Sequence, residues 1–119
     1  MLNNATCFHK IYLVCGYTDL RAGIERLSAV VNEHTQGHPF EQDVLFLFCG
    51  RRADRIKGLV WEGDGFLLLY KRLANGRFQW PRTEQEVLDL TPQQFRWLME
   101  GLQIEQKTAI KESHPLYPG

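Results

Sequence analysis

Residues 43–49 read DVLFLFC, a run that is apolar at every position except the first. The run is too short for a stable helix, and a strand that is apolar on both sides is typical of the middle of a sheet. The sequence therefore predicts a central strand at 43–49, and the neighbouring segments have to supply the strands that pair with it.

The segments that follow have the pattern of an antiparallel meander. Residues 56–62 (IKGLVWE) and 66–73 (FLLLYKRL) are rich in β-branched, aromatic and leucine side chains, and they flank the link 63–65 (GDG). Glycines in so short a link supply the positive φ that a tight hairpin needs. The two segments are therefore predicted to be consecutive antiparallel strands.

A second hairpin is predicted at Asn75–Gly76, a dipeptide that strongly favours a two-residue turn. It leads into 77–80 (RFQW), after which Pro81 blocks further pairing. Residues 43–80 are thus predicted to form about four antiparallel strands. We also expect a positive φ in two or more of three glycines, namely Gly63, Gly65 and Gly76.

Residues 10–16 (KIYLVCG) are predicted to form one more strand, followed by a helix. Thr18 is a good N-cap, Asp19 places a negative charge in the first turn, and Gly37 fits the end of the helix. The apolar face follows from side chains at helical spacing: Leu20, Ile24, Leu27, Val31 and His34.

A second helix is predicted at LTPQQFRWLMEGL, residues 90–102. Thr91 is its N-cap, Pro92 occupies the first helical position, and Gln94 completes a capping box. The expected buried stripe consists of Phe95, Leu98, Met99 and Leu102.

These segments together predict an α+β fold, an antiparallel β-meander of about four to five strands with two helices packed on it. We expect a single domain at 1–105 and a polar, frayed tail at 106–119.

The composition limits the classes of protein to which the chain can belong. With 44% hydrophobic and 24% charged residues, the chain has the composition of an ordinary globular protein. No apolar run approaches the roughly 20 residues of a membrane-spanning helix, and the N-terminus lacks the pattern of a signal peptide. We therefore expect a cytoplasmic protein. The three cysteines form no Cys-x-x-Cys pair, which argues against a zinc site, and we expect Cys15 and Cys49 to be buried thiols.

The sequence contains no recognisable set of catalytic residues. Strand transfer would need three carboxylates gathered around metal ions. Asp64 has a turn explanation, Asp19 a helix-start explanation, and Asp54 sits among arginines. Glu84, Glu86 and Asp89 are spread over a segment whose geometry the sequence does not give. No zinc-protease, phosphate-loop or glycine-rich nucleotide motif occurs. We therefore predict no catalytic residue, no metal, no cofactor and no small-molecule substrate.

Three segments together resemble a known family. They are YLVCGYTDLRAGIERL, LFLFCGRRADRIKGLVWEGDGFLLLYKRLANGRFQWP and LTPQQFRWLMEGL. The resemblance is to the small accessory protein of IS-sixty-six-type bacterial insertion sequences, which is encoded beside the transposase. It covers roughly residues 10–105. It implies a role in transposition beside a separate transposase that carries the strand-transfer chemistry, and it supplies no catalytic residue.

The charge distribution suggests where such a protein would meet nucleic acid. The formal net charge of the whole chain is zero, yet residues 51–82 carry eight basic groups against three acids, a balance of +5. Aromatic residues interleave with these charges, as in many single-strand binders. We expect at least three of the five aromatic rings between Trp61 and Trp80 to be buried. The predicted nucleic-acid-binding residues are Arg51, Arg52, Arg55, Lys57, Lys71, Arg72, Arg77, Arg82, Tyr70 and Trp80, with Tyr70 and Trp80 as the exposed rings.

Two other interpretations stay open. The arginines at 51–55 are also compatible with a solvated turn between two strands. A protein-docking role is the functional rival, in which the acidic C-terminal third and the helix residues Trp97 and Arg96 bind the transposase or another protein of the element without touching DNA.

Overall fold

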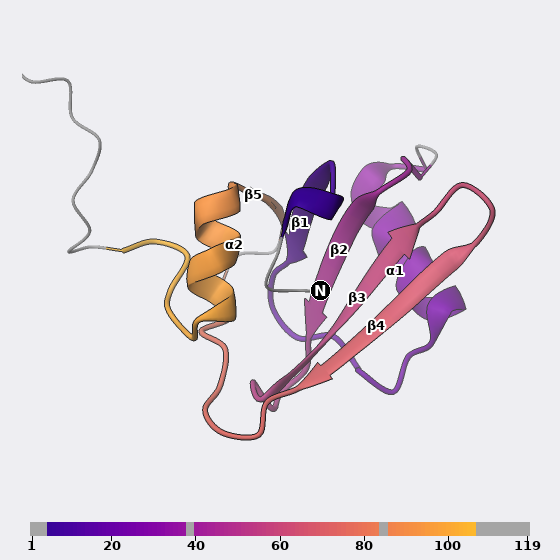
Figure 1. The fold of residues 1–119 in the computed structure, drawn as a ribbon. Helices are drawn as coiled ribbons and strands as arrows, with labels where there is room; N and C mark the ends of the chain where they lie inside the picture. The colour runs from indigo at the N-terminus through magenta and orange to yellow at the C-terminus, as the bar shows by residue number, and fades with distance from the viewer. Residues whose placement is uncertain (1–4, 38–39, 84–85, 107–119) are drawn as a thin grey trace, which may run out of the picture.

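The computed structural model describes residues 5–37, 40–83 and 86–106, which form one sheet and its covering helices (Figure 1). After a short 3-10 turn, η1 (Ala5–Cys7), the elements are β1 (Lys10–Val14), α1 (Ile24–Thr35), β2 (Val44–Cys49), β3 (Arg55–Trp61), β4 (Phe66–Arg72), β5 (Val87–Leu90) and α2 (Pro92–Met99). The five strands are arranged in the order β4-β3-β2-β1-β5. The predicted α+β class is confirmed.

The sheet is mixed, whereas the sequence predicted an antiparallel one. The pairs β2·β3, β3·β4 and β1·β5 are antiparallel, but β1 lies parallel to β2, with Ile11 opposite Leu45. The reason is the connection, because α1 stands between β1 and β2 and carries the chain back to the end where β1 began. A helical crossover of this kind joins parallel strands.

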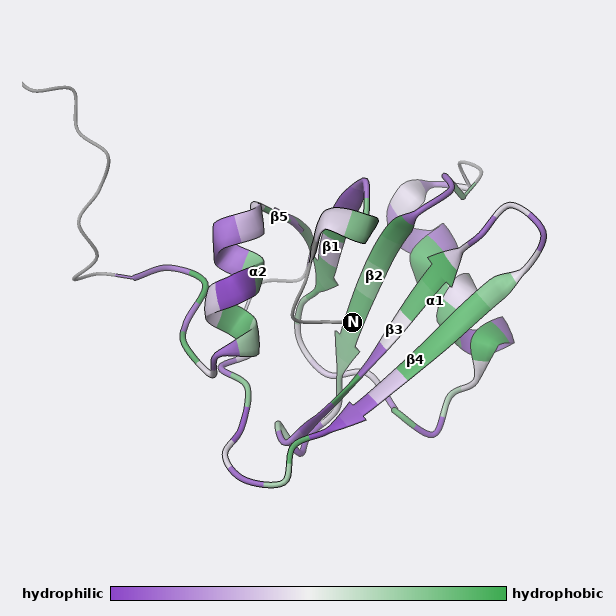
Figure 2. Cartoon of the chain, in the orientation of Figure 1, coloured by the Kyte–Doolittle hydropathy of each residue, from purple (hydrophilic) through white to green (hydrophobic). Residues whose placement is uncertain are grey.

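The central strand is predicted correctly. All six residues of β2 are buried, and the strand pairs with β1 on one side and β3 on the other. Its side chains alternate between two apolar layers. Leu45, Leu47 and Cys49 contact the layer that includes α2, whereas Phe46 and Phe48 contact the layer under α1. Figure 2 shows hydrophobic residues along β2 and along much of β3 and β4.

The second predicted hairpin is wrong. Gly63 and Gly76 do have positive φ values, 93° and 81°, but no strand forms at 77–80. After the turn the chain crosses the end of the sheet, where the Phe78 N–H donates to the Ala53 carbonyl oxygen at 2.7 Å. Phe78 and Trp80 are buried in the core, so their burial decides the path of this segment. The fifth strand is β5 instead, which pairs with β1.

Helix α1 begins later than predicted, at Ile24 with Gly23 as N-cap, although it ends as expected before Gly37. Residues 18–23 form a loop that is fastened to the end of β2, because the Thr18 N–H donates to the Cys49 carbonyl oxygen at 2.9 Å. The side chain of Asp19 accepts the Arg21 N–H at 3.0 Å, which is a loop contact and not a helix cap.

Helix α2 has the predicted capping box. The Thr91 hydroxyl accepts the Gln94 N–H at 3.1 Å, and the Gln94 side chain accepts the Thr91 N–H at 2.9 Å. Phe95 and Leu98 are buried, but Leu102 lies after the helix and is 41% exposed. Of the predicted tail, residues 107–119 lie outside the described residues.

Candidate nucleic-acid interface

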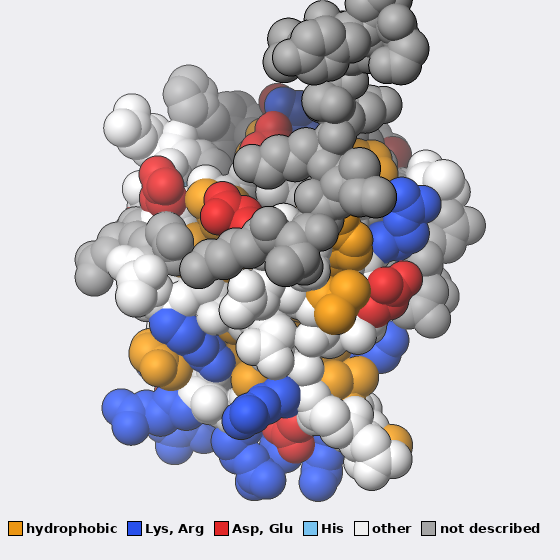
Figure 3. Space-filling model, turned by 90° about the vertical axis from the view of Figure 1, so that its left-hand side faces the viewer, with side chains coloured by type: hydrophobic (Ala, Val, Ile, Leu, Met, Phe, Trp, Pro, Cys, Tyr) orange, Lys and Arg blue, Asp and Glu red, His pale blue; other side chains and the backbone are white. Residues whose placement is uncertain are grey.

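A groove lies at the end of the sheet toward which β1, β2 and β4 point. Its volume is about 600 Å³. It is lined by Tyr17, Thr18, Asp19, Leu20, Arg21, Gly50, Arg51, Arg52, Arg55 and Tyr70. Figure 3 shows Lys and Arg side chains gathered at this end of the molecule, while most acidic side chains on that face lie toward the opposite end. We call this feature the basic groove.

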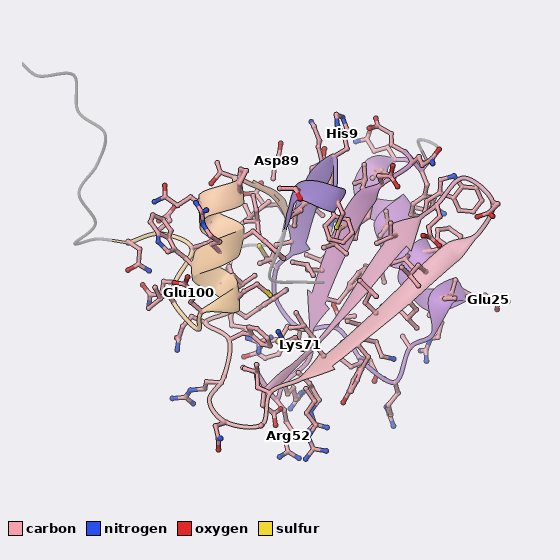
Figure 4. The ribbon with its side chains drawn as sticks, in the orientation of Figure 1. His9, Glu25, Arg52, Lys71, Asp89 and Glu100 are labelled. Atoms are coloured by element: carbon pink, nitrogen blue, oxygen red, sulfur yellow. The ribbon has the colours of Figure 1, made fainter. Side chains whose placement is uncertain are left out.

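The turn between β2 and β3 places three arginines at the groove, and their surroundings differ. Arg55 is tied to its neighbour Asp54, with Nε 3.0 Å and Nη2 3.3 Å from the two carboxylate oxygens. This contact lowers the pKa of Asp54 below its usual range, chiefly through the Arg55 hydrogen bond. Arg51 and Arg52 are exposed, and neither forms a hydrogen bond or ion pair with any residue that the structure describes, although the charge of Arg52 also helps to lower the pKa of Asp54. Arg52 projects beyond the end of the sheet in Figure 4.

The loop from Tyr17 to Gly23 forms the opposite wall of the groove. Arg21 contacts Asp19 through Nε at 3.0 Å and Nη2 at 2.9 Å. The Arg21 side chain and backbone N–H together lower the pKa of Asp19 to about 2. Asp19 offsets the charge of Arg21 as Asp54 offsets that of Arg55. Among the described residues of the groove, Arg51 and Arg52 are the arginines that form no hydrogen bond or ion pair with a carboxylate, although Arg52 lies near enough to Asp54 to help lower its pKa.

Tyr17 is held in place although its side chain points into solvent. The ring is 65% exposed, and the guanidinium carbon of Arg82 lies 4.2 Å from its centroid. Arg82 is fixed in turn, because Nη1 donates to the Gly16 carbonyl oxygen at 2.8 Å and Nη2 to the Cys49 sulfur at 3.6 Å. One ring face is thus covered by an immobilised cation.

Tyr70 stands on the other side of the groove, near the end of β4, and is 54% exposed. The sheet register places it opposite Lys57 and places Arg72 opposite Arg55. Residues that face each other across an antiparallel pair share one face of the sheet, and so do alternate residues of a strand. Tyr70, Lys57, Arg55 and Arg72 therefore lie on the same face.

The structure brings together only part of the predicted set. Arg51, Arg52, Arg55 and Tyr70 line the groove, and Arg82 adjoins it through Tyr17. The Lys57 ammonium group donates to the Ala22 carbonyl oxygen at 3.0 Å, so it fastens the loop before α1. Arg72 and Arg77 are exposed outside the lining, and Lys71 points to the opposite face from Tyr70.

Trp80 is not an exposed ring, contrary to the prediction. It is 7% exposed, and its Nε1 donates to the Val14 carbonyl oxygen at 3.0 Å. The residue follows the chain into the core because no strand forms at 77–80. Of the five aromatic residues between Trp61 and Trp80, two are buried, two are half-buried and Tyr70 is exposed, so the expected minimum of three buried rings is not reached.

Sequence reasoning missed Tyr17 and Arg21. Both lie outside the basic middle third: Tyr17 stands between the predicted strand 10–16 and the first helix, and Arg21 lies in the segment assigned to that helix. The signal for Tyr17 is its place directly after the strand-ending Gly16, and nothing in the sequence alone indicates that this position meets residues 51–55.

The residues of the rival docking interpretation lie on α2. Arg96 is exposed and Trp97 is half-buried. Figure 4 shows Glu100 at the same helix, well apart from Arg52. Among the described residues, no group of three or more His, Cys, Asp or Glu side chains gathers as a metal site, and no helix is long and apolar enough to cross a membrane.

Comparison with known proteins supplies the family. The family model described as IS66 Orf2 like protein matches residues 9–109. The chain belongs to this family. The IS66 Orf2-like proteins are accessory proteins associated with insertion sequences, so this assignment confirms the resemblance seen in the sequence.

Two curated relatives of the IS66 Orf2-like chain come from Sinorhizobium fredii (strain NBRC 101917 / NGR234). Each is 33% identical over 93 residues, which is 78% of this chain. They are called uncharacterized protein y4hO and uncharacterized protein y4jC, and the matches cover 80% and 79% of their respective lengths. No solved structure matches the chain.

Proposed function

We propose that this protein is a non-catalytic accessory factor in transposition that binds nucleic acid, the DNA of the element ends, through the basic groove. One observation carries the proposal. The two most exposed large apolar side chains among the described residues, Tyr17 and Tyr70, line the same groove as the unpartnered Arg51 and Arg52.

The physical chemistry of the groove suits a polyanion. Arginine forms planar, bidentate contacts with phosphate, and each cation that binds a phosphate releases counterions from the nucleic acid. Arg51 and Arg52 need not break an existing contact to make this interaction. Arg55 would have to give up its Asp54 contacts, so we expect a smaller contribution from it.

In this proposal the protein works in the cytoplasm beside the transposase, which performs the strand transfer, and needs no metal or cofactor of its own. The family assignment supports the insertion-sequence context. The basic groove supports the contact with DNA.

The docking role remains the second candidate because of the residues in and directly after α2. Arg96 and Trp97 of α2 lie close in sequence to Leu102, which is 41% exposed and is the third large exposed apolar residue of the described chain. Trp and Arg are common anchors of protein interfaces. In this version α2 binds the transposase, and the basic groove stays unoccupied.

The experiment is a fluorescence anisotropy titration of the purified protein against labelled element-end DNA at several salt concentrations. The variant Arg51→Ala/Arg52→Ala should weaken binding across sequences. The slope of log affinity against log salt should become shallower by about 1.5, because each lost phosphate contact removes roughly 0.7–0.9 of a counterion. The fold should persist, since exposed turn arginines usually contribute within about ±0.5 kcal/mol to stability.

Lys10→Ala/Arg96→Ala is the matched control. It also removes two positive charges, but from the far end of β1 and from α2, and it should leave the salt slope unchanged. Equal effects from both variants would show a general charge effect and would contradict the groove. Unchanged DNA binding in the groove variant, with transposase binding lost in Trp97→Ala, would favour docking instead.

A further inference from the structure

The sheet order places the arginines of the basic groove between its two tyrosines. Tyr70 is on β4, Arg51 and Arg52 are in the turn that joins β2 to β3, and Tyr17 follows β1. Neighbouring strands are about 4.8 Å apart, so β4 and β1 are separated by roughly 14 Å. A chain that crosses this end of the sheet would meet an aromatic ring, then two free cations, then a second aromatic ring.

The rings of Tyr17 and Tyr70 are exposed and do not pack against another aromatic ring among the described residues. Other aromatic rings of the described chain are engaged with each other, as Tyr12 is with Phe46 at 5.3 Å and Phe66 with Trp61 at 4.9 Å. Tyr17 instead has one face on Arg82 and contributes 65% of its surface to solvent. The bonds from Arg82 to the Gly16 oxygen and the Cys49 sulfur fix that guanidinium, so the ring is oriented before any ligand arrives.

Oriented, exposed rings beside free cations match one class of ligand. In a duplex the bases are stacked on each other and their faces are not accessible, so a duplex would use the arginines and leave the tyrosines idle. A single strand offers both phosphates and unpaired base faces, and stacking on aromatic side chains is how sequence-tolerant single-strand binders hold it.

We infer that the basic groove takes a single-stranded polynucleotide, whose unpaired bases stack on Tyr17 and Tyr70 while its phosphates contact Arg51 and Arg52. This inference rests on the proposed function, because it specifies which nucleic acid the groove binds. Arg82 acts as a positioning residue that holds the Tyr17 ring.

The test compares Tyr17→Ala/Tyr70→Ala with Tyr17→Phe/Tyr70→Phe on four labelled probes of equal length. The probes are a thymidine single strand, the uridine RNA equivalent, an abasic strand with the same phosphates, and a DNA duplex. The alanine variant should bind the base-bearing single strand about 5- to 100-fold more weakly for each tyrosine removed. The phenylalanine variant keeps the rings and should bind like the wild type.

The abasic strand and the duplex separate this inference from the proposed function. Neither offers a base face to the tyrosines, so the alanine variant should bind both like the wild type, while Arg51→Ala/Arg52→Ala should weaken binding to all probes. A loss on either the DNA or the RNA strand supports stacking and identifies the preferred sugar. Equal losses on the base-bearing and abasic strands, or no loss on any probe, would overturn stacking and leave the arginine result to decide the proposed function.

Arg82→Ala and Arg82→Lys test the positioning role. If Arg82 acts only by orienting the Tyr17 ring, Arg82→Ala should lower the affinity for the single strand. The double variant Tyr17→Ala/Arg82→Ala should then bind the strand no more weakly than Tyr17→Ala alone. Additive losses in that combination would mean that Arg82 contacts the strand itself and would contradict the positioning role. Circular dichroism and thermal unfolding of each variant confirm that the fold is retained.

Discussion

Trp80 shows that the residues next to a side chain in the sequence do not determine whether that side chain is exposed. It stands between Gln79 and Pro81 near the end of a basic segment, with Arg82 two positions on, which is typical of an exposed ring. In the fold its ring is buried and its Nε1 donates to the Val14 carbonyl oxygen. A buried indole needs such a hydrogen-bond partner, and here the partner lies 66 positions away in the sequence.

Trp80→Phe should therefore destabilise the protein without changing nucleic-acid binding. The variant removes a buried hydrogen bond and part of the ring volume, which together cost about 1–3 kcal/mol in the free energy of unfolding. Urea denaturation measures the loss, and anisotropy measures affinity at a temperature where the variant is folded. Trp97→Phe is the control, because Trp97 is half-buried and forms no side-chain hydrogen bond with the described residues. A loss of affinity in folded Trp80→Phe would return Trp80 to the binding surface.

The first residues of the two helices show when a local capping signal determines where a helix begins. Helix α2 begins where its capping box predicts, because Thr91 and Gln94 satisfy each other's backbone groups without help from the rest of the chain. Helix α1 begins six positions after the predicted cap at Thr18, because residues 18–23 form a loop that tertiary contacts fasten to the sheet. The Thr18 N–H donates to the Cys49 carbonyl oxygen, and Lys57 of β3 donates to the Ala22 carbonyl oxygen.

Thr91→Ala should lower the stability of the protein by about 1 kcal/mol, since it leaves an N-terminal helix N–H without its acceptor. Gln93→Ala is the matched control, because Gln93 is an exposed helix residue outside the capping box and alanine favours a helix. Thermal unfolding of the pair measures the difference. If both variants unfold together with the wild type, the capping box does not stabilise α2.

At the scale of the whole molecule, the fold decides which cysteine thiols are accessible to solvent. Cys15 and Cys49 are buried, as the sequence predicted, whereas Cys7 in η1 is exposed. Burial raises the pKa of the Cys49 thiol, against a smaller opposing effect of Arg82. The Cys49 thiol is therefore protected from reaction both by its burial and because burial favours its protonated form.

Thiol labelling should accordingly separate into two phases at pH 8. Cys7 should react with iodoacetamide at the rate of an exposed thiol, while Cys15 and Cys49 should react only as fast as the core opens. Mass spectrometry of quenched samples counts the modified thiols, and Cys7→Ser should abolish the fast phase alone. Rapid modification of two thiols in the native protein would show that the core at the end of β2 is not closed.

The sequence by itself determined the features that depend on neighbouring residues. These are the buried central strand, the β3–β4 hairpin, the capping box of α2, the α+β class and, through its long motifs, the family. It also pointed to Arg51, Arg52, Arg55 and Tyr70, which line the groove, because a basic excess and its interleaved aromatic residues are visible in the sequence.

Only the tertiary structure decided which of those residues share a surface. Parallel pairing of β1 with β2 puts Tyr17 beside the β2–β3 turn, an encounter that no local pattern records. The carboxylates of Asp19 and Asp54 form ion pairs with Arg21 and Arg55 and none with Arg51 and Arg52, and burial of Trp80 removes one predicted ring. Local propensity acts over a few residues, whereas a surface is assembled from segments that the sheet order brings together, so the basic groove becomes visible only in the folded chain.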